Sequence, residues 1–334
     1  MKLLITGGLG FIGSNFIRYI MNKYPEYKVI NYDKMTYAGN PENLRDIEKD
    51  PHYKFVRGCV TDEKMVNEVV SGEKPDVIIH FAAESHVDRS IHGSLDFMQT
   101  NVLGTRVMLE AAKNYKIERF IYISTDEVYG DIEVGKFKED DPFRPNSPYS
   151  ASKAAADLLA RAYFRTYGVP VLITRSSNNF GPYQYPEKLI PLFITNILEG
   201  KKVPLYGDGL NVRDWLYVLD NCAGIDMILH RGKDGEAYNI GGDNEKTNRE
   251  ITEIILKELG KDESWIEYVK DRPGHDRRYA LDSTKIKKLG WEPKYDFETA
   301  IKEKINWYKN NIDWWRKIKS GEYLEFYKKQ YNNL

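Results

Sequence analysis

The sequence has few cysteines, and neither of them shows a partner. Only Cys59 and Cys222 occur in 334 residues, and neither is paired with another cysteine or a histidine at a metal-ligand spacing. We therefore expect neither a disulfide framework nor a zinc or other metal site. A reducing cytoplasm fits this composition best.

The sequence also has no excess of charge and no long hydrophobic run. Lysine and arginine number 49 against 50 aspartates and glutamates, which gives a formal net charge of -1. This balance provides no basic surface for nucleic acid or an anionic membrane. No run approaches the roughly 20 apolar residues of a membrane span, and Thr6 interrupts the first apolar run before a signal-peptide core could form. We expect neither nucleic acid nor membrane as a partner.

Short β-branched runs alternate with helical patterns in the first half of the chain. This alternation indicates parallel strands joined by crossover helices. We expect strands at 3–6, 29–32, 54–56, 77–81, 119–124 and 172–174, with helices at 11–24, 63–70, 95–113 and 148–167. Ser147 can cap the last of these helices, Pro148 suits its first position and Gly168 can end it.

The second half alternates less clearly and is richer in loops. We expect shorter helices at 190–198, 220–231, 249–260 and 297–309. The final residues mix tryptophan, tyrosine and phenylalanine with lysine, a composition that favours a helix packed on its own protein. A partner or a membrane surface remains the alternative for this segment.

A glycine turn follows the first predicted strand and opens the first helix. Gly8-x-Gly10-x-x-Gly13 has the dinucleotide-binding spacing, and Asp33 ends the next strand 20 residues after Gly13. Glycine lets the backbone approach a pyrophosphate, and the helix N-terminus supplies amide donors. Asp33 would accept hydrogen bonds from ribose hydroxyls and repel the extra phosphate of NADP. We therefore expect a bound NAD.

These patterns predict an α/β protein with a Rossmann-type doubly wound parallel sheet and a smaller α/β substrate-binding lobe on the C-terminal side. Residues 1–175 should form most of the NAD-binding domain, with a return segment at about 211–242. Residues 176–310 should form most of the second lobe. Residues 311–334 should be an aromatic and basic helical tail.

Tyr149 and Lys153 lie four residues apart at the start of the capped helix, so both project from one face. A nearby ammonium would lower the pKa of the tyrosine and make it a usable base. Together with the upstream dinucleotide turn, this pair resembles the short-chain dehydrogenase/reductase superfamily. The spacing Gly7-x-x-Gly10-x-x-Gly13 and the chain length resemble its extended, sugar-nucleotide-modifying branch.

Thr125, Asp126 and Glu127 follow the strand at 119–124, at the carboxyl edge of the sheet where ligands bind in such folds. Two adjacent carboxylates repel each other when both are ionised. One can therefore keep a proton and act as an acid while the other remains a base. The alternative is a strand-ending turn with a helix cap.

Five segments make the resemblance more specific. The chain resembles the dTDP-glucose 4,6-dehydratase family in AAESHVDRS at 82–90, TDEVYG at 125–130, NNFGPYQ at 178–184, GDGLNVRDW at 207–215 and DRPGHD at 271–276. The resemblance implies that Tyr149 takes the proton of the glucose 4-hydroxyl while NAD accepts the hydride from carbon 4. Glu127 then removes the carbon 5 proton and Asp126 protonates the departing 6-hydroxyl. Thr125 holds the 4-oxygen, and NADH returns its hydride to carbon 6.

The resemblance also implies the cofactor contacts. They are Gly7, Gly10, Phe11, Ile12, Gly13, Asp33, Lys34, Met35, Thr36, Cys59, Val60, Phe81, Ala82, Ala83, Ser85, Thr100, Tyr149, Lys153 and Asn179. One of them departs from the family pattern, because Cys59 stands where an aspartate usually reads the adenine amino group. A thiol is a weak acceptor, so adenine affinity is the property that this departure affects.

A nucleoside diphosphate sugar needs cationic donors, for which Lys188, Arg213 and Arg272 are the candidates. Tyr206 is expected to stack near the base. A thymine methyl is worth only about 1 kcal/mol of burial, so the choice of dTDP rests on the resemblance. The implied substrate contacts are Ser85, Thr125, Asn178, Lys188, Leu189, Pro204, Leu205, Tyr206, Arg213, Asn248, Asp271, Arg272, His275 and Tyr279.

Two other functions remain open at this point. The first is another sugar-nucleotide dehydratase or a 4-epimerase of the same branch, and the Asp126-Glu127 pair argues against the epimerase. The second is a non-catalytic NAD(H)-sensing protein, against which the complete catalytic set argues.

The resemblance further implies a homodimer that pairs the helix of Tyr149 and the helix before it in a four-helix bundle. The candidate contacts are Leu103, Val107, Leu109, Ala154, Ala155, Leu158, Leu159 and Ala162.

Overall fold

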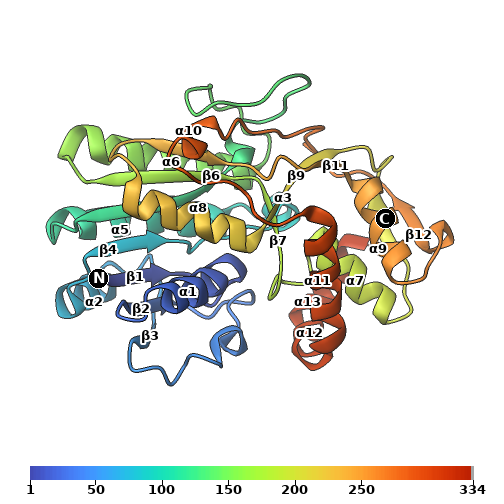
Figure 1. Cartoon of the computed structure of the whole chain (residues 1–334), viewed down its shortest axis with the longest axis horizontal. Helices are drawn as coiled ribbons and strands as arrows, with labels where there is room; N and C mark the ends of the chain where they lie inside the picture. Colours follow the sequence, from blue (N-terminus) through green and yellow to red (C-terminus); the bar gives the residue numbers. More distant parts are fainter. Residues whose placement is uncertain (332–334) are drawn as a thin grey trace.

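A parallel sheet of seven strands lies at the centre of the computed structural model, which describes residues 1–331 (Figure 1). The strand order is β10-β6-β5-β4-β1-β2-β3. The strands are β1 (Lys2–Thr6), β2 (Lys28–Asp33), β3 (Tyr53–Arg57), β4 (Val77–His80), β5 (Arg119–Thr125), β6 (Val171–Ser176) and β10 (Ala237–Ile240). Every neighbouring pair is parallel, so the predicted α/β fold with a doubly wound sheet is confirmed.

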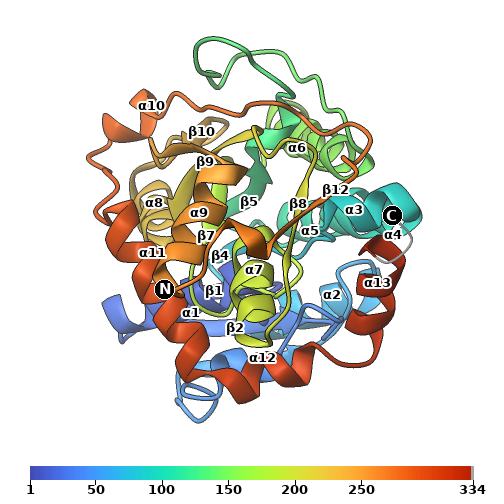
Figure 2. The same cartoon turned by 90° about the vertical axis from the view of Figure 1, so that its right-hand side faces the viewer.

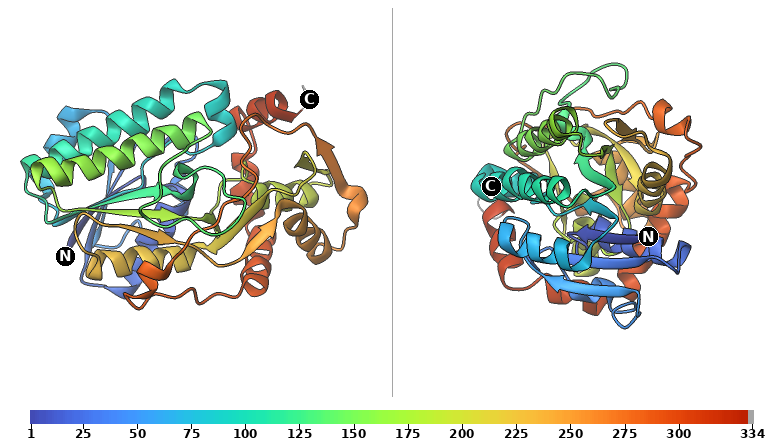
Figure 3. Two further views of the ribbon diagram at one scale, coloured as in Figure 1. Left: turned by 90° about the horizontal axis from the view of Figure 1, so that it is seen from above. Right: turned by 90° about the vertical axis from the view of Figure 1, so that its left-hand side faces the viewer.

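Helices cover both faces of this sheet. Helices α1 (Phe11–Lys23) and α8 (Val218–Arg231) pack on one face, and α2 (Glu63–Glu73), α5 (Thr105–Asn114) and α6 (Pro148–Tyr167) pack on the other. In the left view of Figure 3, α5 and α6 are the teal and green helices that run side by side. Strands covered by helices on both faces are buried along their whole length. Every residue of β4 and β6 is accordingly buried.

The predicted helix at 95–113 is interrupted. It consists of α4 (Leu95–Phe97), a π-helical stretch (Met98–Gly104) and α5. Asn101 lies in the π-helical stretch, and its side chain accepts from the amide of Glu84 at 2.9 Å and donates to the Glu84 carbonyl at 3.0 Å. The irregular turn thus fixes the loop after β4. A short helix in that loop, α3 (Val87–His92), was not predicted.

The remaining elements form a smaller lobe beyond the carboxyl edge of the sheet. Its strands are β7 (Asn178–Phe180), β8 (Val203–Tyr206), β9 (Val212–Tyr217), β11 (Glu245–Thr247) and β12 (Ile266–Val269). Its helices are α7 (Leu189–Leu198), α9 (Asn248–Glu258) and α11 (Phe297–Asn310). A short α10 (Thr284–Lys287) lies beside the large sheet. Single 3-10 turns occur elsewhere along the chain, at Pro41–Leu44, Asp126–Val128 and Glu263–Trp265. Phe180, Phe193 and Ile255 lie in one apolar core shared by these elements.

The aromatic tail forms two helices, α12 (Ile312–Ile318) and α13 (Glu322–Tyr331). Trp314, Trp315 and Tyr323 are buried against the rest of the chain. Figure 2 shows α13 next to α3 and α4. The last three residues of the predicted tail, 332–334, lie outside the described residues. Within residues 1–331, no helix combines the length and apolarity needed to cross a membrane.

Helix α6 is capped as predicted and is tied to the sheet by an ion pair. The Ser147 hydroxyl accepts from the amide of Ser150 at 3.1 Å, and Gly168 ends the helix with φ of 70°. Asp157 accepts from Arg175 of β6 through both carboxyl oxygens, at 2.9 and 3.0 Å, and both side chains are buried. A buried, two-pronged pair of this kind fixes the helix that carries Tyr149.

We expect Asp157→Ala to lower the free energy of unfolding by about 3 kcal/mol, because it leaves the Arg175 guanidinium buried without its partner. Urea denaturation measures the change. The matched control is Glu68→Ala, which breaks an exposed pair with Lys64 and should change stability by no more than about 0.5 kcal/mol. Equal effects of the two substitutions would contradict this role.

Candidate active site

Two adjoining cavities lie along the carboxyl edge of the large sheet. The first extends from the glycine turn to Tyr149, and the second extends into the smaller lobe as far as α13. Glu127, Asn179 and Lys188 line both cavities. A ligand long enough to occupy both would therefore pass Glu127 at the junction.

The glycine turn leaves no room for side chains. A Cβ on Gly13 would lie 2.4 Å from the Gly7 carbonyl oxygen, and a Cβ on Gly7, whose φ is +70°, would lie 2.6 Å from the Ala82 amide nitrogen. The backbone can therefore close tightly around the N-terminus of α1, which points amide donors into the first cavity. This cradle suits a dinucleotide pyrophosphate.

Asp33 ends β2 beside this turn and lines the first cavity. Its carboxylate accepts from the amide of Leu9 at 3.0 Å and from that of Met35 at 2.8 Å. These bonds fix the orientation of the carboxylate and leave each oxygen a further lone pair for ribose hydroxyls. Burial raises the pKa of Asp33, and the two amide bonds oppose this shift.

Cys59 lies on the wall of the first cavity. Its sulfur is 3.0 Å from the Thr61 hydroxyl, and its carbonyl oxygen accepts from the Tyr32 hydroxyl at 2.9 Å. The side chain therefore presents a weak acceptor to the cavity, as the sequence indicated.

Asp126 and Glu127 differ sharply in their surroundings although they are adjacent. Burial raises the pKa of Asp126 well above its usual range, and the charge of Glu127 raises it further. Burial also raises the pKa of Glu127, but the positive charges of Arg272, Lys188 and Arg213 oppose that shift. Burial therefore favours a proton on Asp126, while three neighbouring cations favour a charge on Glu127, which is a division that two adjacent acids allow.

Thr125 connects this pair to the cavity. Its hydroxyl donates to Asp126 at 3.1 Å and accepts from the amide of Glu127 at 3.2 Å, so it also caps the 3-10 turn that follows β5. The second carboxyl oxygen of Asp126 is buried and has no hydrogen-bond partner within residues 1–331. That oxygen is available to a ligand in the first cavity.

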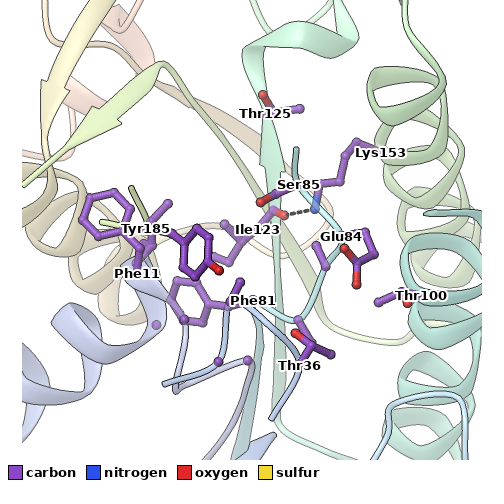
Figure 4. Close-up of a pocket in the computed structure, with 18 of the residues that line it drawn as sticks. Phe11, Thr36, Phe81, Glu84, Ser85, Thr100, Ile123, Thr125, Lys153 and Tyr185 are labelled. Atoms are coloured by element: carbon purple, nitrogen blue, oxygen red, sulfur yellow. Dashed lines mark hydrogen bonds between the residues drawn. The ribbon is translucent and has the colours of Figure 1, made fainter. Parts of the chain in front are cut away.

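The pKa of Tyr149 is raised and not lowered, contrary to our prediction. Burial raises it, and the charge of Glu127 raises it further, while a hydrogen bond with Thr125 opposes the shift. Lys153 donates instead to the carbonyl oxygen of Ile123 at 2.5 Å (Figure 4). Burial lowers the pKa of Lys153 to about 7, so its charge at neutral pH is only partial.

The predicted cofactor residues line the first cavity, with one exception. Met35 does not line the first cavity; it holds Asp33 through its amide. The residues that do line the cavity are Gly7, Gly10, Phe11, Ile12, Gly13, Asp33, Lys34, Thr36, Cys59, Val60, Phe81, Ala82, Ala83, Ser85, Thr100, Tyr149, Lys153 and Asn179. Figure 4 shows Phe11, Phe81 and Thr100 around this space.

Two of the predicted substrate residues do not reach a cavity wall. Asp271 instead accepts from His275 at 2.6 Å. Tyr279 is buried with the Arg213 guanidinium 4.3 Å from its ring centre. The others line one cavity or both, and they are Ser85, Thr125, Asn178, Lys188, Leu189, Pro204, Leu205, Tyr206, Arg213, Asn248, Arg272 and His275.

The three predicted cations are fixed by neighbouring groups. Lys188 donates to the Ser85 carbonyl at 2.7 Å, Arg213 to the Asp276 carbonyl at 2.9 Å, and Arg272 to the Asp88 carboxylate at 2.7 Å. The partners of Lys188 and Arg213 are neutral, and these two side chains keep charge available for an anion in the second cavity.

Sequence reasoning missed several residues of this site. Asp88, Gln184, Trp215 and Tyr331 line the second cavity. Asp88 lies in the segment at 82–90, one of those on which the resemblance is based, so that segment could have indicated Asp88 as a site residue. Tyr331 had no such signal, because only the three-dimensional path of the tail brings it to the cavity.

A model of the family described as GDP-mannose 4,6 dehydratase matches residues 4–304. The chain belongs to this family. The low-salt glycan biosynthesis protein Agl12 of Haloferax volcanii is 53% identical over 92% of this chain and 98% of its own length. A dTDP-glucose 4,6-dehydratase of Escherichia coli is 48% identical over 97% of this chain and 98% of its own length.

The fold agrees with these relatives. The crystal structure of DesIV, a dTDP-glucose 4,6-dehydratase of Streptomyces venezuelae with NAD bound, has a TM-score of 0.93 and 50% identity, and the match covers 95% of this chain and 100% of that one. The resemblance to dTDP-glucose 4,6-dehydratases that the sequence motifs indicated is confirmed.

We expect Asp126 to be protonated at neutral pH, because burial and Glu127 raise its pKa. Infrared difference spectroscopy measures this directly. The spectrum of wild type minus Asp126→Asn should contain the C=O band of a protonated carboxyl, and that of wild type minus Glu127→Gln should contain carboxylate bands. The reverse assignment of the two bands would refute the proposed division of roles.

Proposed function

We propose that this protein is a dTDP-glucose 4,6-dehydratase, which converts dTDP-glucose to dTDP-4-keto-6-deoxyglucose and water. The observation that carries the proposal is the pair Asp126 and Glu127, in which burial favours a proton on the first and three cations favour a charge on the second. A dehydration across two carbons needs both an acid and a base. Simple reduction or 4-epimerisation needs only the group that exchanges the hydroxyl proton, which is Tyr149 in this site, and no second acid and base.

The first cavity fits NAD. Bound NAD would supply the group that accepts the hydride from carbon 4 and later donates it to carbon 6. The turn from Gly7 to Gly13 holds the pyrophosphate, and Asp33 binds the adenosine ribose. Lys153 lies deeper in the same cavity. We expect NAD to copurify with the protein without net release of NADH, since the cofactor ends each turnover as it began.

Tyr149 and Thr125 act on the 4-hydroxyl of the sugar. Tyr149 takes the proton of this hydroxyl as carbon 4 is oxidised to a ketone, and Thr125 turns its one hydroxyl hydrogen from Asp126 to the 4-oxygen. Because burial and Glu127 raise the pKa of Tyr149, the phenolate needs positive charge nearby. Lys153, with a pKa of about 7, supplies part of it in its protonated form.

Glu127 and Asp126 then carry out the elimination. The carbon 4 ketone acidifies the proton on carbon 5, which Glu127 removes. Asp126 donates its proton to the 6-hydroxyl, the bond from carbon 6 to oxygen breaks, and water leaves. Return of a proton to carbon 5 and of the hydride to carbon 6 completes the product.

The smaller lobe, which we assign mainly to residues 176–310, binds the nucleotide. Lys188, Arg213 and Arg272 line the second cavity, and they suit the pyrophosphate. The unpartnered side-chain oxygens of Asn178 and Asn248 are further acceptors on this wall. Cys59 and Cys222 are free thiols, which supports a reducing, cytoplasmic compartment for the enzyme.

Glu127→Gln should separate this function from its rivals. We expect it to lose dehydration and carbon 5 proton exchange by at least about a hundredfold, the contribution of one general base, while oxidation at carbon 4 persists as a transient NADH absorbance. Formation of the 4-keto product is followed by its absorbance in alkali, and solvent deuterium incorporation by mass spectrometry.

Conservative substitution of Glu68, an exposed glutamate, by glutamine is the control and should keep full turnover. Full turnover of Glu127→Gln, or UDP-galactose as the product from UDP-glucose in wild type, would refute the dehydratase. Bound NAD without any product from wild type would favour the NAD(H)-sensing alternative.

We also propose a homodimer through α5 and α6. Leu103, in the π-helical stretch before α5, and Leu158 of α6 are 54% and 55% exposed, and Leu95 and Met98 are further exposed apolar side chains of the helical segment before α5. An apolar surface of this kind indicates association. Val107, Leu109 and Ala154 of the predicted face are buried in the interior of the chain itself, so they cannot contribute.

Light scattering should give a mass of two chains for the wild type. The double substitution Leu103→Glu and Leu158→Glu should give the mass of one chain, because pairing would then require both carboxylates to lose their water. Leu210→Glu, at an exposed position on the other lobe, should remain dimeric. A monomeric wild type would contradict the proposal.

A further inference from the structure

A lysine of α11 is buried behind the wall of the two cavities. None of the Lys304 surface is exposed, and its Nζ donates to the side-chain oxygen of Gln184. The rings of Phe180 and Tyr308 have their centres 5.8 and 5.9 Å from this nitrogen. Burial lowers the pKa of Lys304 well below the usual lysine range. Burial therefore favours a neutral amine, which serves as a hydrogen-bond donor and not as a counter-charge.

Helix α11 holds Gln184 at two points. Lys304 donates to its side-chain oxygen, and the hydroxyl of Tyr308, one helical turn later, donates to its backbone carbonyl. The side-chain nitrogen of Gln184 donates in turn to the Asn179 carbonyl at 2.9 Å. A carboxamide accepts at one end and donates at the other. The bond from Lys304 therefore fixes which end of Gln184 faces Asn179.

Asn179 belongs to β7, an edge strand of the small sheet β11-β9-β7. An edge strand has backbone groups that its sheet leaves unpaired, and Gln184 provides a partner for one of them. Asn178 and Asn179 of this strand line both cavities together with Glu127. Their side-chain oxygens are buried and have no hydrogen-bond partner within residues 1–331. β7 therefore presents two acceptors to ligands at the junction of the cavities.

We propose that Lys304 is a positioning residue, which acts through Gln184 to hold β7 and the acceptors of Asn178 and Asn179 against the cofactor and the sugar. The inference rests on the proposed oxidation of the sugar by NAD. Lys304 lines neither of the two cavities, so its effect reaches the ligands through Gln184. For stability alone a methionine would serve as well, because burying a polar amine costs about what one hydrogen bond returns.

The test compares Lys304→Met, Gln184→Met, their double substitution and the control Lys302→Met in the full chain with bound NAD. Lys302 lies on the same helix with 52% of its side chain exposed. The first readout is the rate constant of carbon 4 oxidation, followed as NADH absorbance with Glu127→Gln also present. A rate constant does not depend on how many molecules are folded. Lys304→Met should lower it about tenfold, because the reacting groups are no longer aligned.

The second readout is the exchange of bound NAD for labelled NAD, which needs no turnover. Lys304→Met should make this exchange about fivefold faster, the effect of one misaligned hydrogen bond. The double substitution should be no slower in oxidation than Gln184→Met alone, because both changes remove the same link. Lys302→Met should match wild type. The melting temperature of Lys304→Met should stay the same or rise, since an apolar side chain of similar volume replaces a buried amine.

The outcomes separate this inference from a structural role and from the proposed function. A lower melting temperature with both rate constants unchanged would overturn the role of Lys304, as would additive effects in the double substitution. If Lys304→Met does not fold, unchanged rate constants in Gln184→Met overturn the inference, and changed ones at wild-type stability support it. If wild type holds NAD but does not oxidise dTDP-glucose, faster NAD exchange in Lys304→Met still supports the positioning role while the dehydratase fails.

Discussion

Asp126 and Glu127 are adjacent, both are buried, and two such carboxylates cannot both be charged without a large electrostatic cost. Three cations lower the pKa of Glu127, whereas burial and the charge of Glu127 are the largest effects on Asp126 and raise its pKa, with the smaller effect of Arg213 opposing them. The cations come from three separate segments of the chain, at Lys188, Arg213 and Arg272. The smaller lobe therefore does more than line the second cavity, because its cations favour the charged form of Glu127.

The same constraint explains why the pair lies at the end of β5. In a fold of this kind, ligands bind at the carboxyl edge of the parallel sheet, where the strands end. Thr125 satisfies the amide of Glu127 there and donates to Asp126. The cap of a short turn and the support of an acid are thus one set of hydrogen bonds, and the capped turn that was the alternative interpretation from sequence is present.

Features encoded by neighbouring residues could be predicted from the sequence. The turn that ends at Gly13, the cap at Ser147 and the helix end at Gly168 each depend on the backbone within a few residues, and all three are found. The break at Asn101 could not be predicted, since it depends on the backbone of Glu84, 17 residues away. The partner of Lys153 could not be predicted either, because the Ile123 carbonyl becomes available only where β5 passes beneath α6.

The tail is the part that sequence patterns described least well, and it is connected to the acid pair by a chain of contacts. Gln330 donates to the Tyr206 hydroxyl, which donates to Asp88 at 3.1 Å, and Asp88 in turn accepts from Arg272. Arg272 is the cation with the largest effect on Glu127. A buried ion pair keeps its strength only while water is excluded, and α13 covers this end of the cavity. Helix α13 is therefore linked through Tyr206 and Asp88 to Arg272, by side chains that have no local sequence signal in common.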